Sequence, residues 1–167
     1  MANRKRRPEP SDDIFATPLV DTYIFRASDV TQYTGVPKWR LEKFLTGKQY
    51  RLSPSGHVGE GKGSWRLFSH EDLYRLAGAY RMVEDGFTAK TVSKVLEDID
   101  DRDLLDTNNE RFENTVTDVG LVRSKDGPRV VFAGSFARER PYYILPLRQL
   151  VREVDRRIAE SRKEKSE

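Results

Sequence analysis

A glycine-proline turn between two short helical segments constrains the fold of this chain more than any other feature. Ser28 is suited to the N-cap of a helix that ends at Gly35, because its hydroxyl can accept an orphan amide and glycine tolerates the left-handed position after a last turn. Pro37 can open a second helix, since its missing N–H would be unpaired there. Two short helices joined in this way predict a helix-turn-helix motif.

The predicted second helix has one apolar face and one cationic face. Leu41, Phe44 and Leu45 are spaced by three and four residues, so they can pack together on one side of the helix. The opposite side carries the candidate DNA-contacting residues Lys38, Trp39, Arg40 and Lys43. This division suits a helix that packs on its own domain while it enters a major groove.

Beyond this helix, a glycine-rich segment at residues 54–63 lies between two β-prone stretches at residues 50–52 and 64–68. This pattern predicts a hairpin. The glycines match neither a Walker A nor a dinucleotide pattern, because they end in a strand-like segment and do not open a helix. Lys62 and Arg66 near this hairpin would let it act as a wing that contacts backbone phosphates beside the second helix. An ordinary flexible surface hairpin is the alternative.

Helices are predicted next. Ser69 and Asp72 form a capping box, and apolar residues follow at helical spacing as far as Val83. After a break at residues 85–86, Thr88 is suited to cap another helix that extends to Ile99.

Charge is distributed unevenly along the chain. Residues 1–66 carry a net charge of +5, residues 67–114 carry −6, and residues 115–167 carry +4. A basic first segment favours attraction to phosphates, whereas an acidic middle segment would be repelled by them. Residues 1–22, rich in arginine and proline, are interpreted as a disordered basic arm that either follows a DNA groove or is only a solvated tail.

Composition also excludes several kinds of site. The chain has no cysteine and only two isolated histidines, so it offers no disulfide framework and no metal cluster. No catalytic triad pattern is present, and neither an enzymatic activity nor a cofactor is expected. Because no apolar run approaches about 20 residues and the start of the chain lacks a signal-peptide core, a cytoplasmic, nucleoid-associated location is expected.

These motifs together resemble the DNA-binding domain of the MerR-type winged helix-turn-helix family over about 75 residues, from residue 25 to 99. The resemblance is carried by Ala27-Ser28-Asp29-Val30, Thr34-Gly35-Val36, Leu41, Phe44, Trp65-Arg66-Leu67-Phe68-Ser69, Asp72-Leu73, Leu76, Asp85-Gly86-Phe87-Thr88 and Val92. It implies that the second helix lies in the major groove, that Arg66 contacts phosphate, and that a helix pair supports the wing.

Three departures from the family pattern stand out. Arg40-Leu41-Glu42 occupies the place of the usual Thr-apolar-Arg triplet, so Arg40 or Lys43 would have to replace the family arginine. The loop before Trp65 is longer and richer in glycine. The absence of cysteine excludes the branch that senses metals or redox state through cysteines.

The remaining chain changes to a period of two. Residues 116–132 predict a strand-turn-strand unit and residues 142–145 a third strand, after an acidic linker at residues 100–114. A final helix has an apolar stripe, which is expected either to form a homodimer or to pack on the β unit. That stripe consists of Leu147, Leu150, Val151, Val154 and Ile158.

The predicted fold class is therefore α+β, with a winged helix-turn-helix domain at residues 23–99 and a small antiparallel β unit with a C-terminal helix at residues 115–163. The leading functional interpretation is a sequence-specific regulator of transcription that binds double-stranded DNA, as a homodimer. One alternative is an architectural DNA-binding protein of phage type, such as an excisionase or a packaging-recognition subunit. The other is an interaction scaffold whose β unit binds a protein partner or a small ligand.

Overall fold

A 15-residue helix, α3 (His70–Glu84), lies at the centre of the fold and packs chiefly against four other elements. They are α1 (Ala27–Thr34), α4 (Ala89–Asp100), β5 (Tyr143–Leu145) and α7 (Leu147–Glu164). The computed structural model describes residues 25–50, 52–58, 65–100, 102, 104–107, 112, 116–164 and 166. The basic arm expected at residues 1–22, and Lys62, lie outside this part.

Helices α1 and α2 (Lys38–Thr46) follow the predicted turn chemistry closely. Gly35 adopts the left-handed conformation, with φ of +75°, and ends α1. The carbonyl of Pro37 accepts the amide of Leu41 at 3.0 Å and so opens α2. The expected cap at Ser28 is wrong, because the Asp29 carboxylate accepts the Arg26 amide at 2.8 Å and the helix begins at Ala27.

The predicted hairpin is present, with a later start than expected. Strands β1 (Gly56–Val58) and β2 (Trp65–Leu67) pair antiparallel. The stretch at residues 50–52 was expected to begin the hairpin, but Tyr50 lies in a turn and is buried. Its ring packs edge-on against Phe44 with 4.9 Å between centroids, so Tyr50 belongs to the core beneath α2.

Two helix caps confirm the sequence patterns. The Ser69 hydroxyl accepts the Asp72 amide at 3.2 Å while the Asp72 carboxylate accepts the Ser69 amide at 3.0 Å. The same carboxylate accepts the amide of Ser55 at 2.8 Å and so holds the start of the hairpin against α3. At α4, the Thr88 hydroxyl accepts the amide of Thr91 at 3.3 Å.

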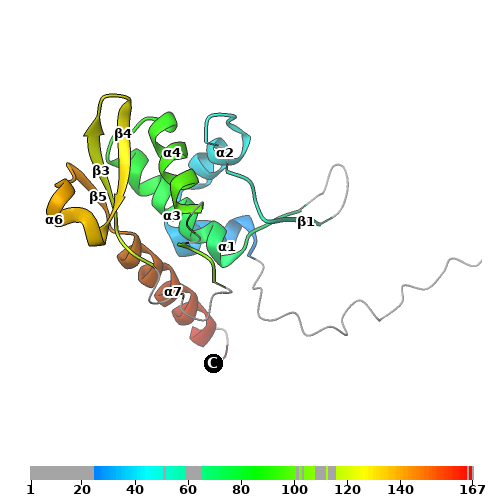
Figure 1. Ribbon diagram of the computed structural model, residues 1–167. Helices are drawn as coiled ribbons and strands as arrows, with labels where there is room; N and C mark the ends of the chain where they lie inside the picture. Colours follow the sequence, from blue (N-terminus) through cyan, green and yellow to red (C-terminus); the bar gives the residue numbers. More distant parts are fainter. Residues whose placement is uncertain are drawn as a thin grey trace, which may run out of the picture.

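The second β unit is a three-stranded antiparallel sheet with strand order β4-β3-β5. Strands β3 (Val119–Ser124) and β4 (Gly127–Phe132) form the predicted hairpin, and β5 pairs with β3. The fold is thus of α+β class. Figure 1 shows this sheet and the β1–β2 hairpin at opposite ends of the molecule, with α3 and α4 between them.

The outer face of this sheet is covered by the segment that includes η2 (Ala133–Ser135) and α6 (Phe136–Glu139). Gly120 allows the close approach: a Cβ at this position would lie 2.7 Å from Cε1 of Phe136 and 2.8 Å from Cβ of Pro141. Arg129 of β4 forms an ion pair with Glu139 of α6 at 2.6 Å, which holds this covering segment against the sheet.

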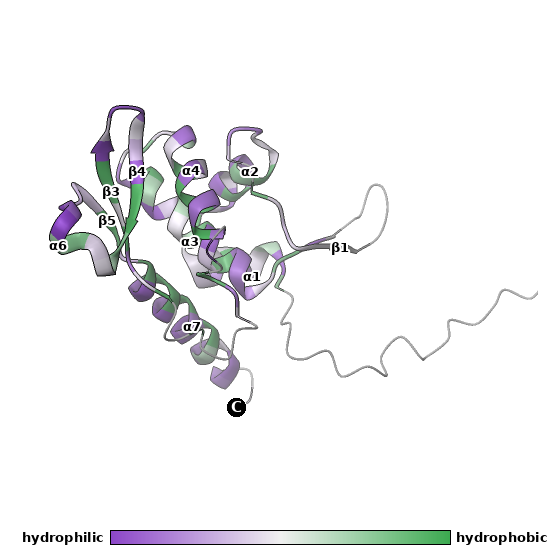
Figure 2. Ribbon diagram, viewed as in Figure 1, coloured by the Kyte–Doolittle hydropathy of each residue, from purple (hydrophilic) through white to green (hydrophobic). Residues whose placement is uncertain are grey.

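The apolar stripe of α7 is covered within the chain, which corrects its assignment to dimerisation. Leu147, Val151, Val154 and Ile158 are at most 5% exposed, and Leu150 is partly buried against the same cluster. Figure 2 shows green and purple residues alternating along α7, as expected for a helix with one apolar face. That face packs mainly on α1 and α3, and not on the β unit that was the alternative to a second copy.

Polar contacts fix α7 against the same two helices. The Tyr74 hydroxyl donates to Asp155 at 2.5 Å, and the Arg157 guanidinium donates to the carbonyl of Tyr33 at 3.2 Å. Burial, and then the bond to Asp155, raises the pKa of Tyr74, so this phenol remains a donor at every physiological pH. One buried cluster therefore joins residues from both predicted parts of the chain.

None of the helices in the described part combines the length and the apolar character that a membrane span requires.

Candidate nucleic-acid interface

Helix α2 is anchored on one side and open on the other. Leu41 and Phe44 are no more than 1% exposed and seat the helix in the core. Trp39 is 62% exposed, the most exposed of the large hydrophobic side chains in the described part. The exposed positions of the helix are Lys38, Trp39, Glu42, Lys43 and Thr46. The open face is therefore cationic and aromatic, with one carboxylate.

Arg40 does not share that open face, which corrects its predicted position. It lies four residues before Phe44 and so at the border of the buried face. Its side chain is only 15% exposed, stacks over the Trp39 ring at 4.3 Å and lies 3.9 Å from a Glu84 carboxylate oxygen. The guanidinium is thus held toward the end of α3, and Lys38 and Lys43 are the cations that α2 presents.

Arg66 lies on β2 beside α2, as the wing interpretation requires. Its guanidinium is 3.4 Å from the Glu42 carboxylate, and the two side chains are 37% and 55% exposed. A pair this exposed contributes roughly 0–1 kcal/mol, so either partner can exchange it for another ligand at little cost. Arg66 is therefore available to an anion that approaches the open face of α2.

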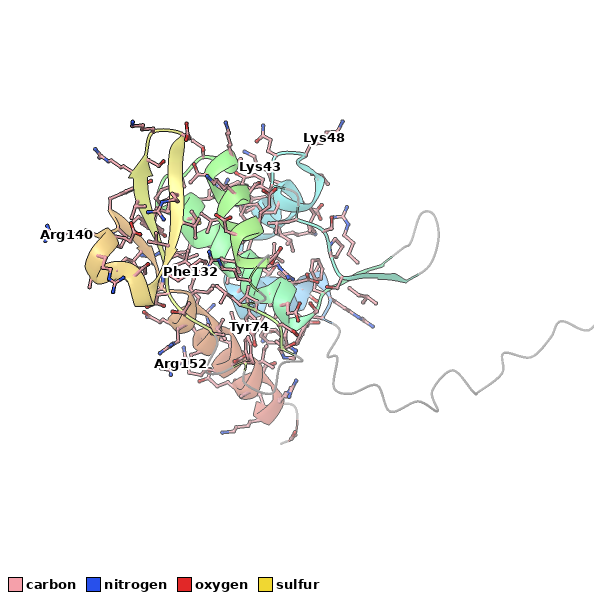
Figure 3. All side chains as sticks on the ribbon, in the orientation of Figure 1. Lys43, Lys48, Tyr74, Phe132, Arg140 and Arg152 are labelled. Atoms are coloured by element: carbon pink, nitrogen blue, oxygen red, sulfur yellow. The ribbon has the colours of Figure 1, made fainter. Side chains whose placement is uncertain are left out.

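A second cationic surface adjoins α2 and was not predicted from the sequence. Residues 48–49, which follow α2, and residues 88–97, most of them on α4, line an open hollow of about 740 Å³. Lys48, Lys90 and Lys94 line it together with one carboxylate, Glu97, which leaves the lining with a net positive charge. Lys43 and Lys48 both lie at the upper end of the molecule in Figure 3.

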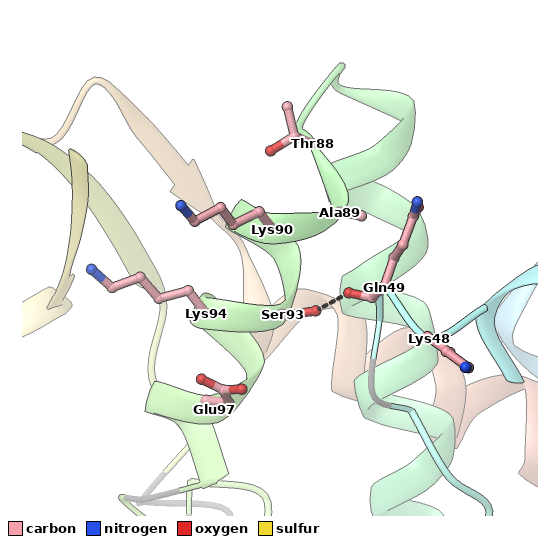
Figure 4. A pocket seen from close by; sticks show the side chains of 8 residues that line it. All are labelled: Lys48, Gln49, Thr88, Ala89, Lys90, Ser93, Lys94 and Glu97. Atoms are coloured by element: carbon pink, nitrogen blue, oxygen red, sulfur yellow. Dashed lines mark hydrogen bonds between the residues drawn. The ribbon is translucent and has the colours of Figure 1, made fainter.

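The hollow is held in shape by a contact between its two walls. The Ser93 hydroxyl of α4 donates to the main-chain carbonyl of Gln49 at 2.7 Å, drawn as the dashed line in Figure 4. In the same view, Lys90 and Lys94 extend from one side of α4 while Lys48 lies on the other. Spacing by four predicts that Lys90 and Lys94 share a face, but only the fold makes Lys48 line the same hollow.

The described residues offer little for other chemistry. No group of three or more histidine, aspartate or glutamate side chains within the described ranges could hold a metal ion. His70 is partly buried, and its ring packs edge-on against Phe25 with 4.9 Å between centroids.

No protein-family model matches the chain, and a search of curated proteins found no significant match.

Proposed function

We propose that this chain is a sequence-specific double-stranded-DNA-binding regulator of transcription, with a winged helix-turn-helix domain similar to that of the MerR family. The observation that carries the proposal is the exposed face of α2, where Lys38, Trp39 and Lys43 stand opposite the buried Leu41 and Phe44. In helix-turn-helix proteins the second helix lies in the major groove, and an exposed cationic face suits α2 to that place.

The neighbouring elements support a duplex as the partner. β2 places Arg66 beside α2, where a guanidinium that leaves Glu42 would bind a backbone phosphate. The lysine-lined hollow continues the positive surface past the C-terminal end of α2. Base reading by α2 and phosphate contacts on both sides of it would together fix the register of the protein on DNA.

Dimerisation remains part of the proposal but requires a surface other than the α7 stripe, which is covered within the chain. A single α2 helix in one groove makes a small interface with DNA. A dimer would place two such helices on DNA and so raise the affinity relative to the many non-specific sites of a genome. Two copies related by symmetry would favour DNA with two half-sites.

Selection from a library of randomised duplexes, followed by sequencing, tests the function. The full chain should enrich one base pattern, and Lys43→Ala should enrich it weakly, whereas Lys163→Ala at the exposed end of α7 should behave as wild type. Recovery of duplexes with no enriched pattern would favour the architectural alternative. Failure to recover any duplex would contradict DNA binding.

A further inference from the structure

A smaller cavity lies on the other side of α4, between that helix and the β3–β4 hairpin. Its volume is about 220 Å³. The apolar part of its lining comes from both elements: Val95 of α4 and Leu121 and Val130 of the hairpin, each at most 9% exposed, with Pro128 beside them. These side chains offer a molecule in the cavity contact with an apolar surface that is screened from water.

The rim of this cavity is polar and predominantly cationic. Lys90 and Lys94 line it from α4, and Asp126 is the one carboxylate among its lining residues. Figure 4 shows the two lysine side chains one helical turn apart and extended toward the hairpin. The Lys94 ammonium donates one hydrogen bond, to the carbonyl of Pro128 at 3.0 Å, so its position over the cavity is fixed while further donors stay available.

We propose that this cavity binds a small organic monoanion, a carboxylate carried on a compact apolar body. The apolar lining would take the body, and the ammonium groups of Lys90 and Lys94 would form charge-assisted hydrogen bonds with the carboxylate. An inorganic anion would leave the apolar lining without a partner, and a neutral molecule would forgo both lysines. The cavity volume of about 220 Å³ is smaller than that of typical cavities for drug-sized ligands, so the apolar part of the ligand should be no larger than a single aromatic ring.

The site is coupled to the proposed DNA-binding surface through shared residues. Lys90 and Lys94 line both this cavity and the larger hollow beside α2. A carboxylate that occupies their ammonium groups would reduce the positive charge that the hollow offers to phosphate. Bound ligand should therefore weaken DNA binding, and this consequence, unlike ligand binding itself, rests on the proposed function.

Titration calorimetry of the full chain with phenylacetate, without DNA, tests the site directly. Phenylacetate should bind, and its neutral analogue phenylacetamide and inorganic phosphate should each bind at least about tenfold more weakly. Lys90→Gln should weaken phenylacetate binding about tenfold while it leaves the Lys94–Pro128 hydrogen bond in place. Lys48→Gln is the matched control, because Lys48 lines only the larger hollow.

Three results would each overturn the site: no binding of phenylacetate, equal binding of the amide, or wild-type binding by Lys90→Gln. The DNA arm is read separately. Phenylacetate that binds a chain without DNA affinity would leave the site standing and refute the proposed function. If the chain binds DNA, Lys48→Gln weakens that binding, and phenylacetate does not bind, the site is refuted and the proposed function is kept.

Discussion

Arg66 of β2 and Glu42 of α2 form an ion pair of 3.4 Å that joins the hairpin to the exposed face of the second helix. In a duplex complex, Glu42 would face phosphates with the wrong sign of charge, and Arg66 would have to leave it. The pair thus holds Arg66 close to its proposed phosphate contact, while the Glu42 carboxylate repels the DNA backbone at short range.

Glu42→Gln should strengthen DNA binding, because it removes a carboxylate from the proposed interface and frees Arg66. We expect a gain of about 1 kcal/mol, roughly fivefold in affinity, at low salt. Fluorescence anisotropy with a labelled duplex measures it. Glu160→Gln is the matched control, since Glu160 is also exposed and paired, with Arg156 on α7. Weaker binding by Glu42→Gln would mean that Glu42 itself contacts the duplex through its carboxylate.

Ile158→Ala should destabilise the monomer, because Ile158 is 4% exposed on the covered face of α7. The lost burial and the resulting cavity should cost about 2–5 kcal/mol of unfolding free energy in denaturant titrations. Arg152→Ala, an exposed position on the same helix, should change it little. A midpoint that rises with protein concentration in the wild type, and not in Ile158→Ala, would instead return this stripe to a dimer interface.

Gly120→Ala should also destabilise the fold, because the new methyl group would lie 2.7 Å from Phe136 and 2.8 Å from Pro141. Displacing the cover over the sheet should cost about 1–3 kcal/mol, measured as a lower melting temperature. Gly134→Ala in η2 meets no atom within 4 Å and should be nearly neutral. Equal melting temperatures for the two variants would show that the cover moves aside freely.

His70 should make stability fall in mild acid. Burial holds its pKa below the usual value; Asp155 opposes that shift and Arg162 adds to it. As the pH falls through about 6.5, the unfolded chain takes up this proton before the folded chain does, so protonation favours unfolding. The free energy of unfolding is therefore highest above the pKa of His70 in the unfolded chain, and it declines as the pH falls through the lower pKa of His70 in the folded chain. Urea titrations across this range should give a shallower decline for His70→Gln, and parallel curves would contradict the assignment.

Local patterns predicted the elements well where the chemistry is local. The capping pair of Ser69 and Asp72 marked the start of α3, and the Asp126-Gly127-Pro128 pattern marked the β3–β4 hairpin, whose turn lies at residues 125–126. Gly35 was expected in the left-handed conformation that it adopts, since few other residues tolerate it.

The misplaced features depend on tertiary contacts. The stripe of α7 could be recognised as apolar, but periodicity does not say whether a second copy or helices α1 and α3 cover it. Arg40 was expected opposite the apolar face of α2, whereas its position one turn before Phe44 lies at the edge of the core, where Glu84 of α3 and the Trp39 ring hold it. Lys48 and Lys90 are far apart in the sequence, and no local signal indicates that they line one hollow.

The salt dependence of binding to a labelled DNA duplex tests the central claim most directly. For the full chain, the logarithm of the binding constant should fall linearly with the logarithm of salt concentration, with a slope that reports several neutralised phosphates. If Lys43 contacts phosphate, Lys43→Ala should weaken binding to every sequence and reduce the slope by about one. If Lys43 reads a base, the loss should be confined mainly to the preferred sequence. Absence of binding at low salt, or binding that is independent of salt and of Lys43, would contradict the account.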